Sequence, residues 1–521
     1  MPQKKQPSTL EKLSLEAVGH LVITIGQEMI QPVVEVSKCD PDCGAMLLKQ
    51  CLGRFNELLY GSVPWYLYDK MAAEVLTSIS SLIKKTKVLQ VGLEPVTNFL
   101  NQMNVVVNLT EIVIHPNLRR IDFSLWPKIM RHVLYKNLYR MSGLEVLNLG
   151  SGSCGWNTSD IEKHIVCGVI SMKNLTSLCL CFDCTDHILT VVSQNCSRLQ
   201  SLDVTASRSV TDRSVNALLA CRQLSELYIN RTSVSVEGYA VLLTGLRRLE
   251  DLGRCDELGV VLERIKLFFR SSSPLGLRMF ESRDVTSRHL HLLVEMCPYV
   301  THVSLYHDEQ VSDLTILASL ENLSELKLSA CDFFTDKVDV LLERKGHDIT
   351  CLHLEHVEEI DTNALMHIGR FCPNVRKLAF INCEFPERLP VPAPRLSAPP
   401  FQRLEQVECV VESAPGHLEL LLSSCGRIRR IRLGSSTGIG DAVMARVLRR
   451  NPMPRLEELR ILHSEQLGMQ TVRLLLKSCG SLRVLSELES WQGISAAELA
   501  LFRQYLRENN IQLDVRPTLS Y

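Results

Sequence analysis

The sequence predicts an α/β protein that folds as a right-handed, horseshoe-shaped solenoid with a small all-α module at its N-terminal end. Two observations support this prediction. A unit of 23 to 31 residues recurs along residues 144–494, and each unit contains an L-x-x-L-x-L pattern followed by a polar turn and an amphipathic run. A period of this length indicates a solenoid, in which stacked units bury apolar faces that a single unit cannot bury alone.

The stretch 196–234 shows the unit most clearly, because Leu199 and Leu202 recur as Leu224 and Leu227. Within each unit we expect a short strand whose leucines point inward, then a turn, then a helix on the outer side. The first leucine position of the fourteen predicted units falls at Leu144, Leu175, Leu199, Leu224, Leu249, Leu277, Val300, Leu323, Ile349, Val375, Leu404, Ile428, Leu456 and Leu482.

Cysteines recur at one position of the repeat. A position that faces the same side of every unit cannot pair with its own copy one unit away throughout the array. We therefore predict buried, reduced thiols that act as small apolar residues. Together with the polar first eight residues, which lack the apolar core of a signal peptide, they indicate a cytoplasmic or nuclear protein. These cysteines are Cys196, Cys221, Cys297, Cys372, Cys425 and Cys479.

The charge balance disfavours several classes of function. Lys and Arg number 57 against 58 Asp and Glu, so the formal net charge is −1. This balance gives no general attraction to nucleic acid or to an anionic membrane. No apolar run approaches the ~20 residues that span a bilayer. Because no nucleophile–base pair, glycine-rich phosphate loop or nucleotide motif is present, we expect a non-catalytic binding subunit without a cofactor.

Cys-Pro and Thr-Asp pairs flank the helical halves of several units. Cys297 and Cys372 each begin a Cys-Pro-x-Val run, and Thr185, Thr211 and Thr335 each precede an aspartate. Units with these marks resemble cysteine-containing leucine-rich repeats, familiar from F-box receptor proteins and similar substrate-recognition subunits. The resemblance covers most of the chain and implies a protein-binding surface on the repeats.

Residues 1–92 carry no repeat and are predicted to form three amphipathic helices. The apolar stripe of the first begins at Leu10 and is expected to break at Pro32. After a turn over residues 39–44, the second helix is predicted over residues 45–60, and the third follows Pro64. We expect these helices to form an adaptor-binding module.

Two caps and one insertion complete the predicted organisation. Residues 93–143 are predicted to form an N-terminal cap of degenerate repeats, with strand motifs at 108–114 and 117–123. Residues 495–521 are predicted to form a C-terminal cap, because Ser495-x-x-Glu498 has the capping-box pattern, with a final edge strand at 511–515. The proline-rich insertion 386–400 is either an extended soluble loop or a polyproline ligand.

A motif in the first predicted helix resembles the BC-box, by which substrate receptors bind the elongin B–elongin C adaptor. The motif is Thr9-Leu10-x-x-x-Ser14-x-x-x-Val18. The resemblance implies that these side chains lie along one helical face, where the leucine fills a pocket of the adaptor and the serine permits close approach. A second frame in the next helix resembles the same box and remains an alternative. It consists of Leu47, Cys51 and Phe55.

The third predicted helix opens with Val63-Pro64-x-x-Leu67, which resembles the cullin box that selects cullin-2. An apolar-Pro pair also opens the F-box, which binds a Skp adaptor, so this motif alone leaves both alternatives open. The order of BC-box helix, apolar-Pro helix and leucine-rich repeats resembles the ZYG/ZER receptor family. That family adds an armadillo-like domain that recognises degrons. Since this chain has no such domain, the family's substrate class is not carried over.

The repeat template also predicts which side chains point outward from the strands. They lie two, four and six places after the first leucine, because successive side chains of a strand alternate between its faces. A row of aromatic and charged residues on a rigid surface favours recognition of a protein substrate. The predicted row contains Tyr228, Asn230, His302, Tyr306, Lys327, His353 and Glu355.

Two clusters suggest metal ligands, but neither leads to a predicted metal site. Cys39, Cys43 and Cys51 lack a second pair that would complete four ligands. His353 and His356 fall on either side of a strand end, with several nearby carboxylates in the turn. Together, the resemblances to the BC-box, the cullin box and the ZYG/ZER receptors imply a substrate receptor of a cullin–RING ubiquitin ligase, and no metal is expected. The alternatives are an F-box-like receptor and a leucine-rich-repeat scaffold outside any ligase.

Overall fold

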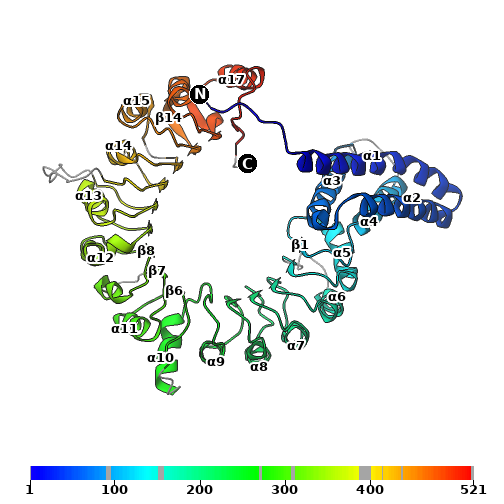
Figure 1. Ribbon diagram of the computed structural model, residues 1–521, viewed down its shortest axis with the longest axis horizontal. Helices are drawn as coiled ribbons and strands as arrows, with labels where there is room; N and C mark the ends of the chain where they lie inside the picture. Colours follow the sequence, from blue (N-terminus) through cyan, green and yellow to red (C-terminus); the bar gives the residue numbers. More distant parts are fainter. Residues whose placement is uncertain are drawn as a thin grey trace. The chain divides into compact units, whose positions relative to one another are not determined.

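The computed structural model describes residues 2–89, 96–150, 158–268, 273–306, 311, 313–386, 400–412, 415–435 and 438–517. The chain forms two compact units. One contains Ser8–Gly253, and the other contains Arg254–Tyr521 together with Met1–Pro7. Each unit is a stack of strands and helices, preceded in the first by a group of long helices (Figure 1).

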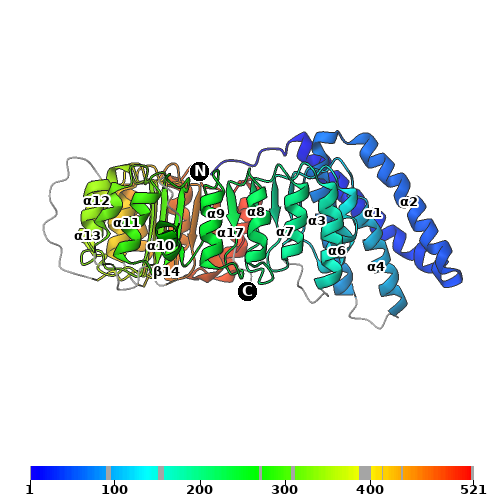
Figure 2. The same ribbon diagram turned by 90° about the horizontal axis from the view of Figure 1, so that it is seen from below.

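Helices open the first unit: α1 (Leu10–Cys39), α2 (Pro41–Ser62), the short 3-10 helix η1 (Trp65–Leu67), α3 (Tyr68–Leu89) and α4 (Val96–Glu111). Figure 2 shows α1 and α2 as two long helices. Glycines on α1 allow a close approach to α3. A Cβ on Gly19 would lie 2.6 Å from Ser78 Oγ, and one on Gly26 would lie 2.7 Å from Leu82 Cδ2. Gly19 and Gly26 therefore allow α1 to approach α3 closely.

Three predicted helices are present here, but three details predicted for this region are wrong. Helix α1 continues through Pro32 to Cys39. Only Asp40 separates α1 from α2, in place of the predicted turn over residues 39–44. Asp40 Oδ1 accepts a hydrogen bond of 2.9 Å from Asp42 N and so caps α2. Asn108–Glu111, predicted as part of a strand, is helical and ends α4. The buried residues Val105 and Leu109 are four apart, which fits the face of a helix.

Five parallel strands follow in the order β1-β2-β3-β4-β5. They are β1 (Arg120–Asp122), β2 (Val146–Asn148), β3 (Ser177–Cys179), β4 (Ser201–Asp203) and β5 (Glu226–Tyr228). Their helices are α5 (Lys128–Lys136), η2 (Leu138–Arg140), α6 (Thr158–Ser171), α7 (Asp186–Asn195), η3 (Asp212–Ser214), α8 (Val215–Ala220) and α9 (Val236–Gly245).

The second unit holds a nine-stranded parallel sheet. Its strands are β6 (Met279–Arg283), β7 (His302–Tyr306), β8 (Glu325–Ser329), β9 (Cys351–Glu355), β10 (Lys377–Ile381), β11 (Gln406–Val410), β12 (Arg430–Leu433), β13 (Glu458–Ile461) and β15 (Val484–Ser486). The helices beside it are α10 (Leu258–Phe268), α11 (Ser287–Met296), η4 (Leu314–Ser319), α12 (Val338–Lys345), η5 (Gly346–Asp348), α13 (Thr362–Phe371), α14 (Pro415–Ser424), α15 (Asp441–Arg450) and α16 (Met469–Ser478).

The strand positions confirm the predicted α/β class of stacked repeats. A described strand begins two residues after the predicted first leucine of every unit except the one at Leu249. That unit contributes a single bridge between Asp251 and Glu226. The first leucines are buried, as are the inward residues of the strands, and the helices lie along one side of each sheet (Figure 1).

The repeated cysteines are buried and free, as predicted. They also mark the change from helix to strand. Cys196, for example, is the C-cap of α7: its N–H donates to Val192 O, and its carbonyl accepts from Leu199 N at 3.1 Å. A small apolar side chain suits this site because the next turn begins immediately inside the core.

The C-terminal end consists of β14 (Ser464–Gly468), η6 (Leu488–Ser490), β16 (Trp491–Gly493) and α17 (Ala496–Glu508). The predicted capping box is confirmed, because Ser495 and Glu498 exchange hydrogen bonds at the start of α17. The expected edge strand at 511–515 is reduced to two single bridges, Ile511 with Lys4 and Asp514 with Val484. Most of the proline-rich insertion lies outside the described residues.

Candidate functional site

An apolar stripe lies exposed on the outer face of α1. Leu10 is 81% exposed, Leu13 48% and Leu21 40%. Gly19 and Val22, which are buried, lie on the opposite side of the helix and face α3 or the core. Large apolar side chains that gather on one exposed helical face mark a surface available to a partner.

The first BC-box frame lies on this exposed face. Thr9 is the N-cap of α1, and its Oγ1 accepts a hydrogen bond of 3.2 Å from Lys12 N. Ser14 is exposed, and its hydroxyl donates to Leu10 O at 2.8 Å, so the small side chain folds back against its own helix. Val18 is half-buried. The structure therefore brings Leu10, Ser14 and Val18 onto one accessible face.

The second frame is only partly accessible: Cys51 is exposed, Leu47 is half-buried and Phe55 is buried. Phe55 is only 6% exposed. Together with Leu47 and Cys51 it lines a cavity of about 330 Å³ whose other wall is the α1 segment around Pro32. An adaptor could reach Phe55 only after α2 separated from α1. The geometry thus favours the first frame over the second.

The predicted cullin-box residues surround the short helix η1. Pro64 is its N-cap, while Val63 and Leu67 are half-buried. The most exposed residues here were not singled out from the sequence: Trp65 is 60% exposed and Tyr66 is 66% exposed. The Arg119 guanidinium lies 5.3 Å from the centre of the Trp65 ring, which holds the indole against β1.

The second candidate surface is the strand face, defined as the outward strand positions of the nine-stranded sheet. Five predicted residues lie on its consecutive strands β7, β8 and β9. In the backbone register, Lys327 of β8 lies opposite His353 of β9. Ser329 of β8 lies between Tyr306 of β7 and Glu355 of β9. The structure therefore assembles His302, Tyr306, Lys327, His353 and Glu355 as neighbours.

Polar contacts between neighbouring strands hold these side chains in place. Lys327 Nζ lies 3.0 Å from Glu355 Oε2, and His302 Nε2 lies 3.0 Å from Glu325 Oε1. Burial alone would raise the pKa of Glu355, but the hydrogen bond and charge of Lys327, with the nearby rings of His353 and His356, together outweigh burial and lower that pKa. These pairs leave the face polar without a large net charge.

His353 sits at the centre of this row. Its Nε2 is buried without a hydrogen-bond partner among the described residues and lies 3.8 Å from Glu355 Oε2. Burial, and then the Lys327 charge, lower the pKa of His353. His356 turns away at φ 51°, and the Glu359 carboxylate accepts from Phe334 N at 2.8 Å. The residues that suggested a ligand cluster in the sequence therefore diverge.

Tyr228 and Asn230 do not belong to this row, which corrects the prediction of one row along neighbouring strands. Tyr228 lies in β5, the last strand of the five-stranded sheet. Its hydroxyl lies 2.8 Å from Asp251 Oδ2, and its ring covers Gly253, where a Cβ would come within 2.5 Å of the ring. Burial and this hydrogen bond raise the pKa of Tyr228. These contacts make Tyr228 a structural residue of its sheet.

The strand face extends to residues that the sequence analysis did not single out. Glu408, Arg432 and Arg460 stand opposite one another on β11, β12 and β13. Arg432 Nη1 lies 3.0 Å from Glu408 Oε1. At the other end, the Arg283 guanidinium lies 4.7 Å from the centre of the Tyr306 ring. The same template, applied to every unit, would have identified these residues.

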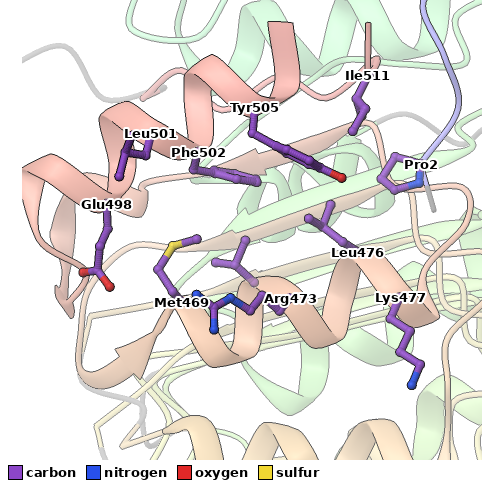
Figure 3. Close-up of a pocket in the computed structure, with 11 residues that line it drawn as sticks. Pro2, Met469, Arg473, Leu476, Lys477, Glu498, Leu501, Phe502, Tyr505 and Ile511 are labelled. Atoms are coloured by element: carbon purple, nitrogen blue, oxygen red, sulfur yellow. The ribbon is translucent and has the colours of Figure 1, made fainter. Parts of the chain in front are cut away.

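An apolar cavity of about 620 Å³ lies between α16 and α17. Figure 3 shows Phe502 and Tyr505 of α17 facing Leu476 of α16, with Pro2 at one end. Arg473, Lys477 and Glu498 stand at its rim. Because Pro2 comes from the start of the chain, this cavity is built from both ends of the sequence.

Taken together, parallel strands, buried leucines at the L-x-x-L-x-L positions and helices along one side of each sheet define a leucine-rich-repeat fold. No family model matches the chain, and no curated protein matches it. None of the described helices is long and apolar enough to span a membrane.

Solved structures show distant likenesses. The Rad7–Elc1 complex of yeast contains a chain that is 12% identical, with a TM-score of 0.42 over 94% of this chain and 96% of that one. A leucine-rich-repeat protein of Leptospira interrogans is 14% identical, with a TM-score of 0.36 over 77% and 95%. An internalin of Listeria monocytogenes is 15% identical, with a TM-score of 0.33 over 68% and 83%. At these values the likenesses carry no weight in choosing a partner.

Proposed function

We propose that this protein is a non-catalytic substrate receptor of a cullin–RING ubiquitin ligase. In this proposal the outer face of α1 binds the elongin B–elongin C adaptor, the segment around η1 binds cullin-2, and the strand face binds a protein substrate. The observation that carries the proposal is the exposure of Leu10 beside Ser14 on α1.

Exposure of Leu10 has a physical cost that a partner would remove. A leucine side chain gains about 1.5–3 kcal/mol when it is fully buried, and Leu10 is 81% exposed. Ser14, one turn further along, leaves room for a partner helix or loop to approach the α1 backbone. Leu13 and Leu21 extend the same apolar surface.

The proposed cullin contact rests on Trp65 and Tyr66. Aromatic side chains with a polar atom are favoured anchors in protein interfaces. Both are more than half exposed on a short helix whose start is fixed by Pro64. Val63 and Leu67, which are half-buried, would position this helix and contact cullin-2 only at its edge.

For the substrate, the strand face offers alternating acidic and basic groups with aromatic and imidazole rings among them. Lys327 and Glu355 form an ion pair, and His302 Nε2 lies 3.0 Å from Glu325 Oε1, so these side chains are held in place before a substrate binds. Preorganised polar groups of this kind favour specificity over raw affinity. We therefore propose a protein segment of mixed charge as the ligand of this face.

Capture of purified adaptor tests the proposal. The full-length protein is immobilised and exposed to elongin B–elongin C, with and without cullin-2. Leu10→Ser should weaken adaptor binding at least about tenfold, the equivalent of ~1.4 kcal/mol of lost burial, without changing the thermal midpoint. A Trp65→Ala/Tyr66→Ala variant should retain the adaptor and lose cullin-2.

Two control variants make the result specific. Leu125→Ser removes a leucine that is 69% exposed outside α1 and should leave binding unchanged. Leu47→Ser tests the second BC-box frame and should likewise leave adaptor binding unchanged. Binding that survives Leu10→Ser would reject the assignment. Capture of a Skp adaptor instead would support the F-box-like receptor, and capture of neither would support the scaffold.

A further inference from the structure

Two thiols and one carboxylate converge on the outward side of the five-stranded sheet. Cys179 ends β3, and its register partner Asp203 ends β4. Cys181 follows Cys179 by two residues, so its side chain returns to the same face. The ligand atoms of the three residues lie within 4.8 Å of one another, and this is the only such group of three among the residues that the structure describes.

The surrounding hydrogen bonds hold the group in place. Asp203 Oδ1 accepts from Thr205 N at 3.0 Å and from Thr205 Oγ1 at 2.6 Å. The other oxygen, Oδ2, is thereby directed to Cys179 Sγ at 3.6 Å. Leu180 N donates to Asp203 O at 2.8 Å, which fixes the backbone between the two cysteines.

The spacing of these atoms matches three corners of a tetrahedral zinc site. The two sulfurs are 3.6 Å apart, and Cys179 Sγ is 3.6 Å from Asp203 Oδ2. A zinc ion with bonds of about 2.3 Å to sulfur and about 2.0 Å to oxygen would place these pairs about 3.8 Å and about 3.5 Å apart. A disulfide would instead require a sulfur separation of about 2.05 Å.

The charges of the group also favour a cation. A negative carboxylate beside two thiols disfavours a thiolate, and a divalent cation bound between them would reverse that effect. All three side chains are half-buried, which leaves one side of the group accessible.

We propose that Cys179, Cys181 and Asp203 form a zinc site with a fourth position open to water or to a ligand from a bound protein. Two thiolate ligands and one carboxylate suit zinc, whereas calcium and magnesium require oxygen ligands. On binding, each thiol releases its proton to solvent. This site departs from the expectation of a metal-free protein and is independent of the proposed ligase role.

Zinc stoichiometry in the full-length protein tests the proposal. The reduced protein is stripped with a chelator, loaded with Zn²⁺, dialysed and analysed for bound metal, and Co²⁺ is used as a spectroscopic substitute. One equivalent of zinc and the absorption of tetrahedral, sulfur-ligated cobalt are expected. Cys179→Ser/Cys181→Ser should lose both signals, and Asp203→Asn, which can keep its hydrogen bonds to Thr205, should weaken zinc binding about tenfold or more.

The matched control is Cys39→Ser/Cys43→Ser, which removes another closely spaced pair of cysteines, both exposed. This variant should bind zinc like the natural sequence. Zinc that stays bound in the Cys179→Ser/Cys181→Ser variant would overturn the proposal, as would zinc lost with Cys39 and Cys43. A protein two hydrogens lighter that binds no zinc would identify a disulfide instead. Circular dichroism of each metal-free variant separates loss of ligands from loss of fold.

Discussion

At the scale of single residues, the side chains of the strand face are partly buried and contact one another. His353 is the clearest case. Its Nε2 lies 3.8 Å from Glu355 Oε2 and is buried without a hydrogen-bond partner among the described residues. The neutral form of this imidazole is favoured, because burial and the Lys327 ammonium both oppose its protonation.

We predict that His353 makes the fold sensitive to acid. Its pKa in the folded chain lies below the value of ~6.5 for an unperturbed histidine. Below that value the unfolded chain binds a proton that the folded chain does not bind, so stability falls as the pH falls toward the folded pKa. His353→Gln should therefore lose less stability between about pH 7.5 and about pH 5.5, as measured by the midpoint of urea unfolding.

The control for this prediction is His347→Gln. His347 has a side chain that is 79% exposed, so its replacement should leave the pH dependence unchanged. His115, His132 and His289 also have pKa values lowered by burial, so part of the acid sensitivity should remain in the His353→Gln variant. An unaltered pH dependence in that variant would contradict the assignment.

The row around His353 shows how far a sequence can identify individual side chains. The repeat template placed His302, Tyr306, Lys327, His353 and Glu355 on one face because strand alternation is local and regular. It placed Tyr228 in the same row, although the Tyr228 hydroxyl hydrogen-bonds to Asp251 and its ring packs on Gly253. Such contacts depend on the shape of one irregular unit, which periodicity does not describe.

At the scale of elements, adjacent repeats are joined by aspartates at the starts of helices. The Asp186 carboxylate, at the first residue of α7, accepts from Thr211 N at 2.8 Å and from Thr211 Oγ1 at 2.7 Å. Asp212 accepts from Ser235 N at 2.8 Å in the following repeat. The carboxylate of one helix thus satisfies a backbone N–H of the segment that enters the next helix.

Asp186→Ala should destabilise the first unit by about 1.5–3 kcal/mol, the range for hydrogen bonds to a charged group. Burial alone would raise the pKa of Asp186, but hydrogen bonds from Ser214 and Thr211 outweigh it and lower that pKa. The stabilisation is therefore present above the unfolded pKa of ~3.9 and is lost as the pH falls through the lower folded value. Urea unfolding at neutral pH measures the loss.

A matched variant distinguishes the loss of the contact between Asp186 and Thr211 from a general effect of removing a carboxylate. Asp42→Ala removes an exposed aspartate from the first turn of α2 in the same unit and should change stability by less than about 0.5 kcal/mol. Equal losses in the two variants would show that the contact between Asp186 and Thr211 is not the cause.

The elements themselves were more predictable than their ends. Strand positions followed from the leucine spacing, whereas the break at Pro32 was wrong: α1 packs against α2, α3 and α4, and its segment around Pro32 lies against α2. Packing against neighbours outweighs the local cost of a proline within a helix. Similarly, the Thr-Asp pairs were visible in the sequence, but the partner of each aspartate lies one repeat away.

At the scale of the whole molecule, the first residues of the chain complete its last repeat. Lys5 N donates to Asn510 O at 2.9 Å, Gln512 N donates to Gln3 O at 2.8 Å, and Lys4 bridges Ile511 in antiparallel fashion. Pro2 lines the cavity between α16 and α17 (Figure 3). A contact between residues about 505 positions apart leaves no periodic signal, so the sequence indicated only that the first eight residues are polar.

Deletion of residues 2–7 should therefore loosen the C-terminal end while sparing the adaptor site. Two backbone hydrogen bonds are lost, worth about 1–3 kcal/mol together, so amide hydrogen exchange at residues 510–514 should accelerate by about tenfold or more. Lys4→Ala/Lys5→Ala keeps the backbone bonds and should exchange like the natural sequence. Because Leu10 belongs to the other compact unit, elongin B–elongin C capture should be unaffected. Unchanged exchange at residues 510–514 after the deletion would show that the first residues do not hold this end in solution.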